Sequence, residues 1–165
     1  MRRRQLLFAA GAALAAACTP ASAGSSTTST GSIPPDRPND PNAGNPAAGI
    51  WPGWLASQPP QTKQAYLYAS QNHAVMQYIP CYCGCGSASH NGGHADNERC
   101  YIVSRGTGGW MILEPHATTC GTCIGITLDV KTWLAAGVSL KDVRTRIDQK
   151  WSSAGPSTPT KFPPS

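Results

Sequence analysis

The sequence lacks an apolar run long enough to cross a bilayer as a helix. The longest apolar run is Leu6–Ala17, which follows three arginines and is directly followed by Cys18. A membrane-spanning helix needs about 20 apolar residues, whereas the apolar core of a signal peptide needs about 7 to 15. We therefore expect residues 1–18 to be a signal peptide and not a transmembrane anchor.

The sequence also lacks a strong charge imbalance once the three arginines at residues 2–4 are set aside. The chain contains 13 basic and 8 acidic residues, so 10 basic residues remain and the net charge is near +2. Binding to nucleic acid, or to a membrane through a polybasic patch, depends on clustered positive charge. The composition supports neither class of partner, and we expect no nucleic-acid binding.

Large apolar residues are scarce toward both ends of the remaining chain. Ile33 is the only one between residues 19 and 49, and residues 155–165 have a similar composition. Such segments bury too little surface to offset the entropy lost on ordering. We expect a disordered tether at residues 19–49, one folded domain at residues 50–154 and a disordered tail at residues 155–165.

The end of the apolar run resembles the lipobox of bacterial lipoproteins, in which a cysteine becomes the lipidated first residue after cleavage. Three alanines precede Cys18, but Leu14 is four places before it and the usual spacing is three. Cleavage a few residues later, at an ordinary signal peptide without an anchor, is the alternative. The arginine pair at residues 3 and 4 also matches a twin-arginine export signal. We expect an exported cell-envelope protein, anchored to the membrane by a lipid on Cys18.

Hydrophobic periodicity predicts a domain that is mainly helical. One amphipathic helix should end before Pro80, because apolar-face residues recur at steps of three and four at Tyr66, Ala69, His73, Met76 and Ile79. A second helix should run from about residue 119 to Gly137, and a third should follow a capping box at residues 139–142 and extend to residue 151.

Two short apolar runs, at residues 100–103 and 110–113, are separated by glycines and predict a β-hairpin. Together these elements predict a small α+β fold, mainly α, with about three helices around a cysteine-rich loop and a short β-hairpin.

Six of the seven cysteines lie close together in the sequence, with histidines among them. In residues 80–86, Pro-Cys-Tyr-Cys-Gly-Cys-Gly, the cysteines alternate with other residues. Alternate residues of an extended chain point to one face, so the three sulfurs should line up and Tyr82 should point away. Further along, Cys120 and Cys123 should share the first turn of a helix, whose N-terminus favours the thiolate form.

The segment from Pro80 to Gly86 resembles the signature of the bacterial family named for its PCYCGC motif, whose members are mostly predicted lipoproteins of unestablished function. The resemblance extends from about Tyr66 to Trp151, and it includes Gly93-His94 before Cys100 and His116 before Cys120-Gly-Thr-Cys123. It implies a metal-binding protein, with copper as the suspected metal, and no activity can be transferred from the family.

Three interpretations of the sulfurs compete. The first is an interaction domain that is stabilised by disulfides and binds no metal, because exported domains often pair their cysteines. A thiol–disulfide oxidoreductase using Cys120 and Cys123 is another, although the helical tail leaves too little strand sequence for a thioredoxin-like fold. Metal binding is favoured, because cysteines one residue apart cannot easily bridge each other and disulfides do not need neighbouring histidines.

We therefore predict a metal-binding protein and not an enzyme, since the sequence offers no general base. Soft, closely spaced thiolates favour Cu(I), with zinc second. The predicted role is buffering, storage or transfer of the ion, with a metal-donor or metal-acceptor protein as the partner. The predicted ligands are Cys81, Cys83, Cys85, His94, Cys100, His116, Cys120 and Cys123.

Overall fold

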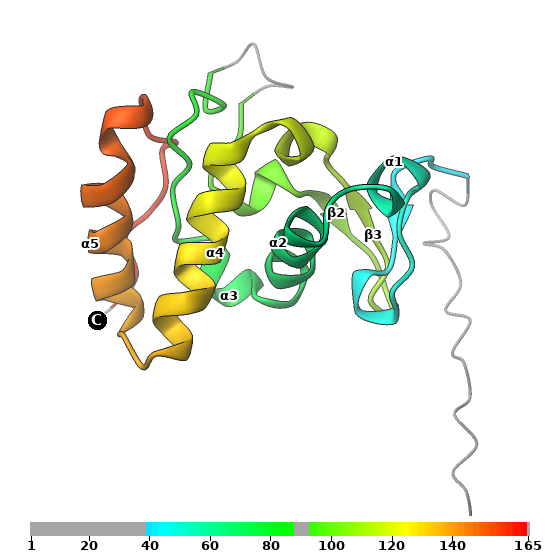
Figure 1. Ribbon diagram of the computed structural model, residues 1–165, viewed down its shortest axis with the longest axis horizontal. Coiled ribbons are helices and arrows are strands. Elements are labelled where there is room, and N and C mark those ends of the chain that lie inside the picture. Colours follow the sequence, from blue (N-terminus) through cyan, green and yellow to red (C-terminus); the bar gives the residue numbers. More distant parts are fainter. Residues whose placement is uncertain (1–38, 88–92, 165) are drawn as a thin grey trace, which may run out of the picture.

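The computed structural model describes residues 39–87 and 93–164. Within these residues five α-helices and a small antiparallel sheet form a mainly helical α+β fold, so the predicted fold class is confirmed. Figure 1 shows the sheet toward one end of the molecule and the last two helices, α4 and α5, toward the other. The predicted signal peptide and Cys18 lie outside the described residues.

The sheet is built around strand β3 (Met111–Leu113), which pairs with β1 (Ala43–Gly44) on one side and β2 (Ile102–Arg105) on the other. Strands β2 and β3 form the predicted hairpin. The side chain of Asn45, directly after β1, donates a hydrogen bond of 3.0 Å to the Gly108 carbonyl in the hairpin turn. The sheet therefore has a third strand that the sequence did not predict.

The fold extends beyond the predicted domain limits of 50–154 at both ends. Strand β1 and a 3-10 helix at Pro46–Ala48 lie in the segment predicted to be a disordered tether. In the predicted disordered tail, Thr158 is only 2% exposed. Its hydroxyl accepts a hydrogen bond from the Cys81 N–H, and its own N–H donates to the Cys81 carbonyl. Composition shows that apolar side chains are scarce in these segments, but it does not show that their backbone pairs with distant residues. The folded domain therefore begins before residue 50 and extends beyond residue 154.

The helix predicted to end before Pro80 is divided into separate pieces. After the short α1 (Gly53–Ala56), helix α2 (Pro60–Gln71) begins at a proline and α3 (His73–Met76) follows a break at Asn72, whose φ of −122° and ψ of 43° are not helical. The break turns His73 outward: its side chain is 58% exposed and its Nδ1 lies 2.6 Å from Glu98 Oε2. The predicted place of His73 on the apolar face is therefore wrong.

Helices α4 (Gly121–Ala135) and α5 (Leu140–Trp151) agree closely with the sequence prediction. The Ser139 side chain accepts a hydrogen bond from the Asp142 N–H, as the capping box requires. The two helices approach closely at Gly125, where an added Cβ would lie 2.5 Å from the Trp151 ring. Within the described part of the chain, no helix combines the length and apolarity needed to cross a membrane.

Candidate metal centre

The cysteine-rich loop at residues 81–87 has no regular secondary structure and turns sharply at Gly84, whose φ is +80°. Cys81 Sγ lies 3.4 Å from Cys83 Sγ, and the sulfurs of Cys81, Cys83 and Cys85 all lie within 4.8 Å of one another. Tyr82 points the other way, and its hydroxyl donates a hydrogen bond of 2.7 Å to Asp148 on α5. The three sulfurs are grouped as the alternation in the sequence predicts.

The N-terminus of α4 brings a second set of donors to this loop. Cys120 is the N-cap residue, and its sulfur accepts a hydrogen bond from the Cys123 N–H at 3.5 Å. Cys123 Sγ lies 3.1 Å from Cys120 Sγ and 3.2 Å from Cys81 Sγ. His116, in the preceding 3-10 helix (Pro115–Thr119), has its Nε2 3.5 Å from Cys83 Sγ.

A third set of donors lies on the buried side of the loop. Cys100, at the end of the 3-10 helix Glu98–Cys100, has its sulfur 3.5 Å from that of Cys85. The His94 N–H donates to the Cys85 carbonyl at 2.8 Å, and the His94 ring meets the His116 ring edge-on, with 5.0 Å between centroids.

His94 itself has a buried polar atom without a hydrogen-bond partner. The residue is 6% exposed, and its Nδ1 finds no partner among the described residues. A buried polar atom left unpaired is costly and therefore uncommon in native structures. A metal ion bound to the His94 ring would compensate for the burial of this histidine.

The fold thus brings all eight predicted ligands together. Their ligand atoms form four overlapping groups that could hold a metal ion, with all the atoms of each group within 4.8 Å of one another: Cys83, His116, Cys120 and Cys123; Cys85, His94, Cys100 and His116; Cys81, Cys83 and Cys85; and Cys81, Cys100 and Cys123.

The sulfurs are spaced as neighbours and not as bonded pairs. All six described cysteines are free, and the neighbouring sulfurs lie 3.1–3.6 Å apart. A disulfide bond is about 2.05 Å long, whereas thiolates at about 2.3 Å from one tetrahedral zinc ion lie about 3.8 Å apart. The observed spacing is close to that of ligands sharing an ion.

Hydrogen bonds between the sulfurs distribute their protons unequally. The pKa of Cys120 is lowered to about 2, first by the hydrogen bond from the Cys123 thiol, with further contributions from the Cys83 thiol and the Cys123 N–H. The pKa of Cys123 is raised, because hydrogen bonds to its neighbours, Cys100 foremost, favour the protonated thiol. These hydrogen bonds therefore favour the thiolate at Cys120 and the protonated thiol at Cys123, and a bound cation would displace the thiol protons.

The predicted tail supplies supporting residues that sequence reasoning missed. The Thr158 hydroxyl accepts a hydrogen bond from the Cys81 N–H at 3.0 Å, and the Thr158 N–H donates to the Cys81 carbonyl at 2.9 Å. Two residues later, the Thr160 hydroxyl donates to the Ala95 carbonyl beside His94 at 2.8 Å. The tail is thus hydrogen-bonded to both segments that carry predicted ligands. Its amino-acid composition does not predict these contacts.

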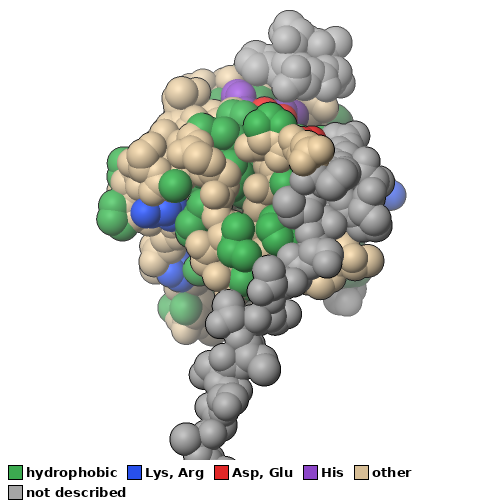
Figure 2. Space-filling view, turned by 90° about the vertical axis from the view of Figure 1, so that its right-hand side faces the viewer, with side chains coloured by type: hydrophobic (Ala, Val, Ile, Leu, Met, Phe, Trp, Pro, Cys, Tyr) green, Lys and Arg blue, Asp and Glu red, His purple; other side chains and the backbone are tan. Residues whose placement is uncertain are grey.

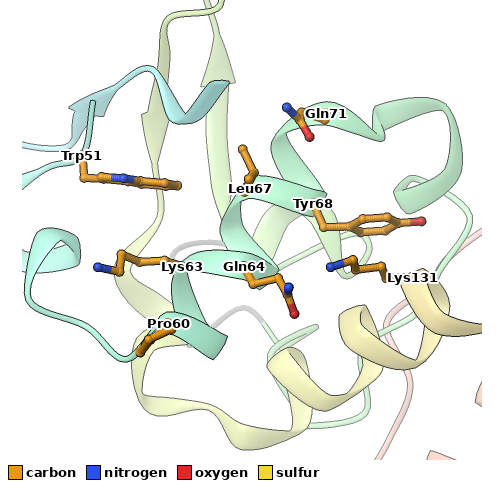
Figure 3. Close-up of a pocket in the computed structure, with 8 residues that line it drawn as sticks. All are labelled: Trp51, Pro60, Lys63, Gln64, Leu67, Tyr68, Gln71 and Lys131. Atoms are coloured by element: carbon orange, nitrogen blue, oxygen red, sulfur yellow. The ribbon is translucent and has the colours of Figure 1, made fainter. Parts of the chain in front are cut away.

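One pocket in the described surface lies apart from the cysteines. A pocket of about 400 Å³ lies between α2 and α4, with the Trp51 and Tyr68 rings on either side of Leu67 (Figure 3). Its lining includes Lys63 and Lys131 but no cysteine, histidine or acidic residue. This pocket offers no ligand for a soft metal ion.

Comparison with known proteins agrees with the motif at the centre of the site. A family described as proteins of unknown function with a PCYCGC motif matches residues 10–165, nearly the whole chain. The chain belongs to this family. The match confirms the resemblance seen at Pro80–Gly86, and it assigns no activity to the PCYCGC-motif protein. Neither the curated proteins nor the solved structures contain a match to this chain.

Proposed function

We propose that this PCYCGC-motif protein binds a soft metal ion in the cell envelope and buffers, stores or transfers it. The observation that supports this most is the convergence of six thiols and two imidazoles, from the loop, the Cys100 turn and the N-terminus of α4, into overlapping ligand groups. A fold that needed only disulfide staples would gain nothing from histidines at the same place.

Copper(I) is the proposed ion and zinc the second choice. Thiolates are soft ligands, and six of them beside two imidazoles suit Cu(I) or a group of Cu(I) ions better than harder cations. The buried surroundings of Cys81, Cys85 and Cys100 would also limit access of water and oxidants to the ion.

Transfer to a partner protein requires that part of the site can be reached from outside. Cys83, His116 and Cys120 are only partly buried, whereas the other predicted ligands are buried. An incoming or departing ion would be exchanged at these three residues. A metal-donor or metal-acceptor protein presenting its own thiolates there is the proposed partner, and we propose a binding protein, not an enzyme.

The proposed location rests on the sequence before residue 39. The apolar run ending at Cys18 supports export and a lipid anchor at that cysteine. On the face of the domain seen in Figure 2, Lys and Arg side chains are scattered among hydrophobic and other side chains.

The test of metal binding is the metal content of the full chain after anaerobic loading with Cu(I) and, separately, with Zn(II). We expect Cys83→Ser to lower the affinity for the metal by more than about tenfold. Loss of even a residue that only supports a ligand lowers metal affinity by about 10–100-fold. Cys18→Ser is the matched control, because it removes a cysteine that is not among the predicted ligands, and it should retain the full metal content. Unchanged affinity in Cys83→Ser would remove this residue from the ligand set.

Counting thiols separates metal binding from the disulfide alternative. After denaturation without reductant, a metal-bound domain releases six alkylatable thiols from the cluster once a chelator is present. Three disulfides would release none, and that result would overturn the proposal.

The Cys120–Cys123 pair supports a second candidate function, thiol–disulfide exchange. The two sulfurs lie 3.1 Å apart at a helix N-terminus, with Cys120 partly exposed and Cys123 buried. In such a reaction the Cys120 thiolate would attack a protein disulfide, forming a mixed disulfide and releasing the first substrate thiol. The Cys123 thiolate would then attack the Cys120 sulfur and release the second substrate thiol, which leaves a Cys120–Cys123 disulfide that an external dithiol must reduce for turnover. Turnover of a reporter disulfide that Cys120→Ser abolishes would favour this function over metal storage.

A further inference from the structure

Two of the ligand groups are each large enough to hold an ion of their own. The outer group consists of Cys83, His116, Cys120 and Cys123, and the inner group consists of Cys85, His94, Cys100 and His116. Each group offers four ligand atoms within 4.8 Å of one another, and four is the number that a tetrahedral Zn²⁺ site uses. A single ion could not use both groups, because together they exceed its coordination number.

The outer and inner groups differ in their donors and in their accessibility. The outer group has three sulfurs, and Cys83 and Cys120 are partly exposed. The inner group has two sulfurs, both buried, and the buried His94 ring with its unpartnered Nδ1. His116 belongs to both groups and lies at their boundary.

Cys81 is the residue that connects the two groups. It completes one triplet with Cys83 and Cys85 and another with Cys100 and Cys123, so each triplet pairs Cys81 with one outer and one inner cysteine. Its sulfur is fully buried and lies 3.4 Å from Cys83 and 3.2 Å from Cys123. The two backbone hydrogen bonds to Thr158 hold Cys81 in this central position.

We infer that the cluster is a binuclear metal centre in which the Cys81 thiolate bridges an outer and an inner ion. This inference rests on the proposed metal binding and adds the number of ions and the residue between them. A thiolate sulfur has several lone pairs and can bind two cations at once. Each ligand thiol gives up its proton to solvent as the ions bind, and a shared thiolate lowers the repulsion between the two cations.

The test is the ¹¹³Cd NMR spectrum of the reduced full chain loaded with ¹¹³Cd²⁺, a thiolate-preferring cation whose nucleus reports its own ligands. We expect two resonances of equal intensity, with the outer ion downfield, because with the shared Cys81 it has one more sulfur ligand than the inner ion. A bridging sulfur connects the two nuclei through two bonds, so each resonance should be split by the other. In Cys81→Ser both resonances should lose this splitting, whereas the control Cys18→Ser should keep it.

Two further variants keep the result interpretable if Cys81→Ser does not fold. Cys120→Ser should remove or shift the downfield resonance, and Cys100→Ser should do the same to the upfield one. A single resonance with one Cd²⁺ per chain would overturn the binuclear centre and leave metal binding intact. Two resonances without splitting in the unmodified chain would overturn the bridge at Cys81, and no bound Cd²⁺ in the reduced protein would overturn the proposed function as well.

Discussion

Cys120 has one observed role, as the cap of α4, and one proposed role, as a metal ligand, and substitution can separate them. Its sulfur caps α4 by accepting the Cys123 N–H, and the same sulfur belongs to the outer ligand group. Serine is among the best N-cap residues and alanine among the poor ones, whereas neither replaces a thiolate as a ligand for a soft metal.

At this residue we predict that Cys120→Ser and Cys120→Ala both lose the outer ion but differ in the stability of the metal-free protein. Cys120→Ala should be less stable than Cys120→Ser by about 1 kcal/mol, because it lacks an acceptor for the Cys123 N–H. Chemical denaturation of the reduced, metal-free variants, together with their metal content, checks this. Equal metal binding by wild type and Cys120→Ser would show that the cap is the only role of this cysteine.

At the scale of elements, the contact between α4 and α5 determines how firmly the N-terminus of α4 is held. The Trp151 ring lies against Gly125, and its indole N–H donates to Asp129 Oδ2 at 2.9 Å, so two residues of α4 hold the ring. A side chain at residue 125 would meet the ring and not open space.

We predict that Gly125→Ala destabilises the domain by about 1–3 kcal/mol, the usual cost of overpacking, because the new Cβ would be 2.5 Å from the Trp151 ring. The midpoint of thermal unfolding measures the effect. Gly53→Ala is the matched control, since an added Cβ there meets nothing within 4 Å. If the two variants unfolded at the same temperature, the Trp151 ring would have to move aside without cost.

At the scale of the whole molecule, the chain after α5 returns to the cysteine-rich loop. The Arg144 guanidinium donates to the carbonyls of Tyr78 and Lys161, at 2.9 and 3.0 Å, and so joins the segment before the loop to the tail. Together with Thr158 this contact places the C-terminal segment against the cysteine-rich loop of the candidate metal centre (Figure 1).

We predict that Thr158→Val lowers the stability of the metal-bound domain by about 1–3 kcal/mol, because the buried Cys81 N–H loses its acceptor. Cu(I) affinity, measured by competition with a chromogenic chelator, should fall with it. Thr132→Val, at an exposed position on α4, should change neither quantity. Unchanged affinity and stability in Thr158→Val would mean that the tail only covers the loop.

Local sequence was sufficient for much of the helical structure and for the identity of the clustered residues. The capping box at Ser139 and the periodicity that follows it depend on residues a few positions apart, and α5 has the predicted bounds. The β2–β3 hairpin is likewise a local pairing around glycines. By contrast, the helix break at Asn72 reversed the predicted environment of His73, because periodicity cannot detect one non-helical residue within an otherwise regular pattern.

The sequence by itself determined which side chains are available: six thiols and two imidazoles around the PCYCGC motif, grouped by alternation in the loop and by the first turn of α4. Only the tertiary structure decided how they divide into outer and inner groups, that Cys81 lies between them, and that Thr158 holds it there. These relations join residues as far as 77 positions apart. Spacing along the chain cannot specify such distances, because the packing of α4, the Cys100 turn and the tail around the loop brings these residues together.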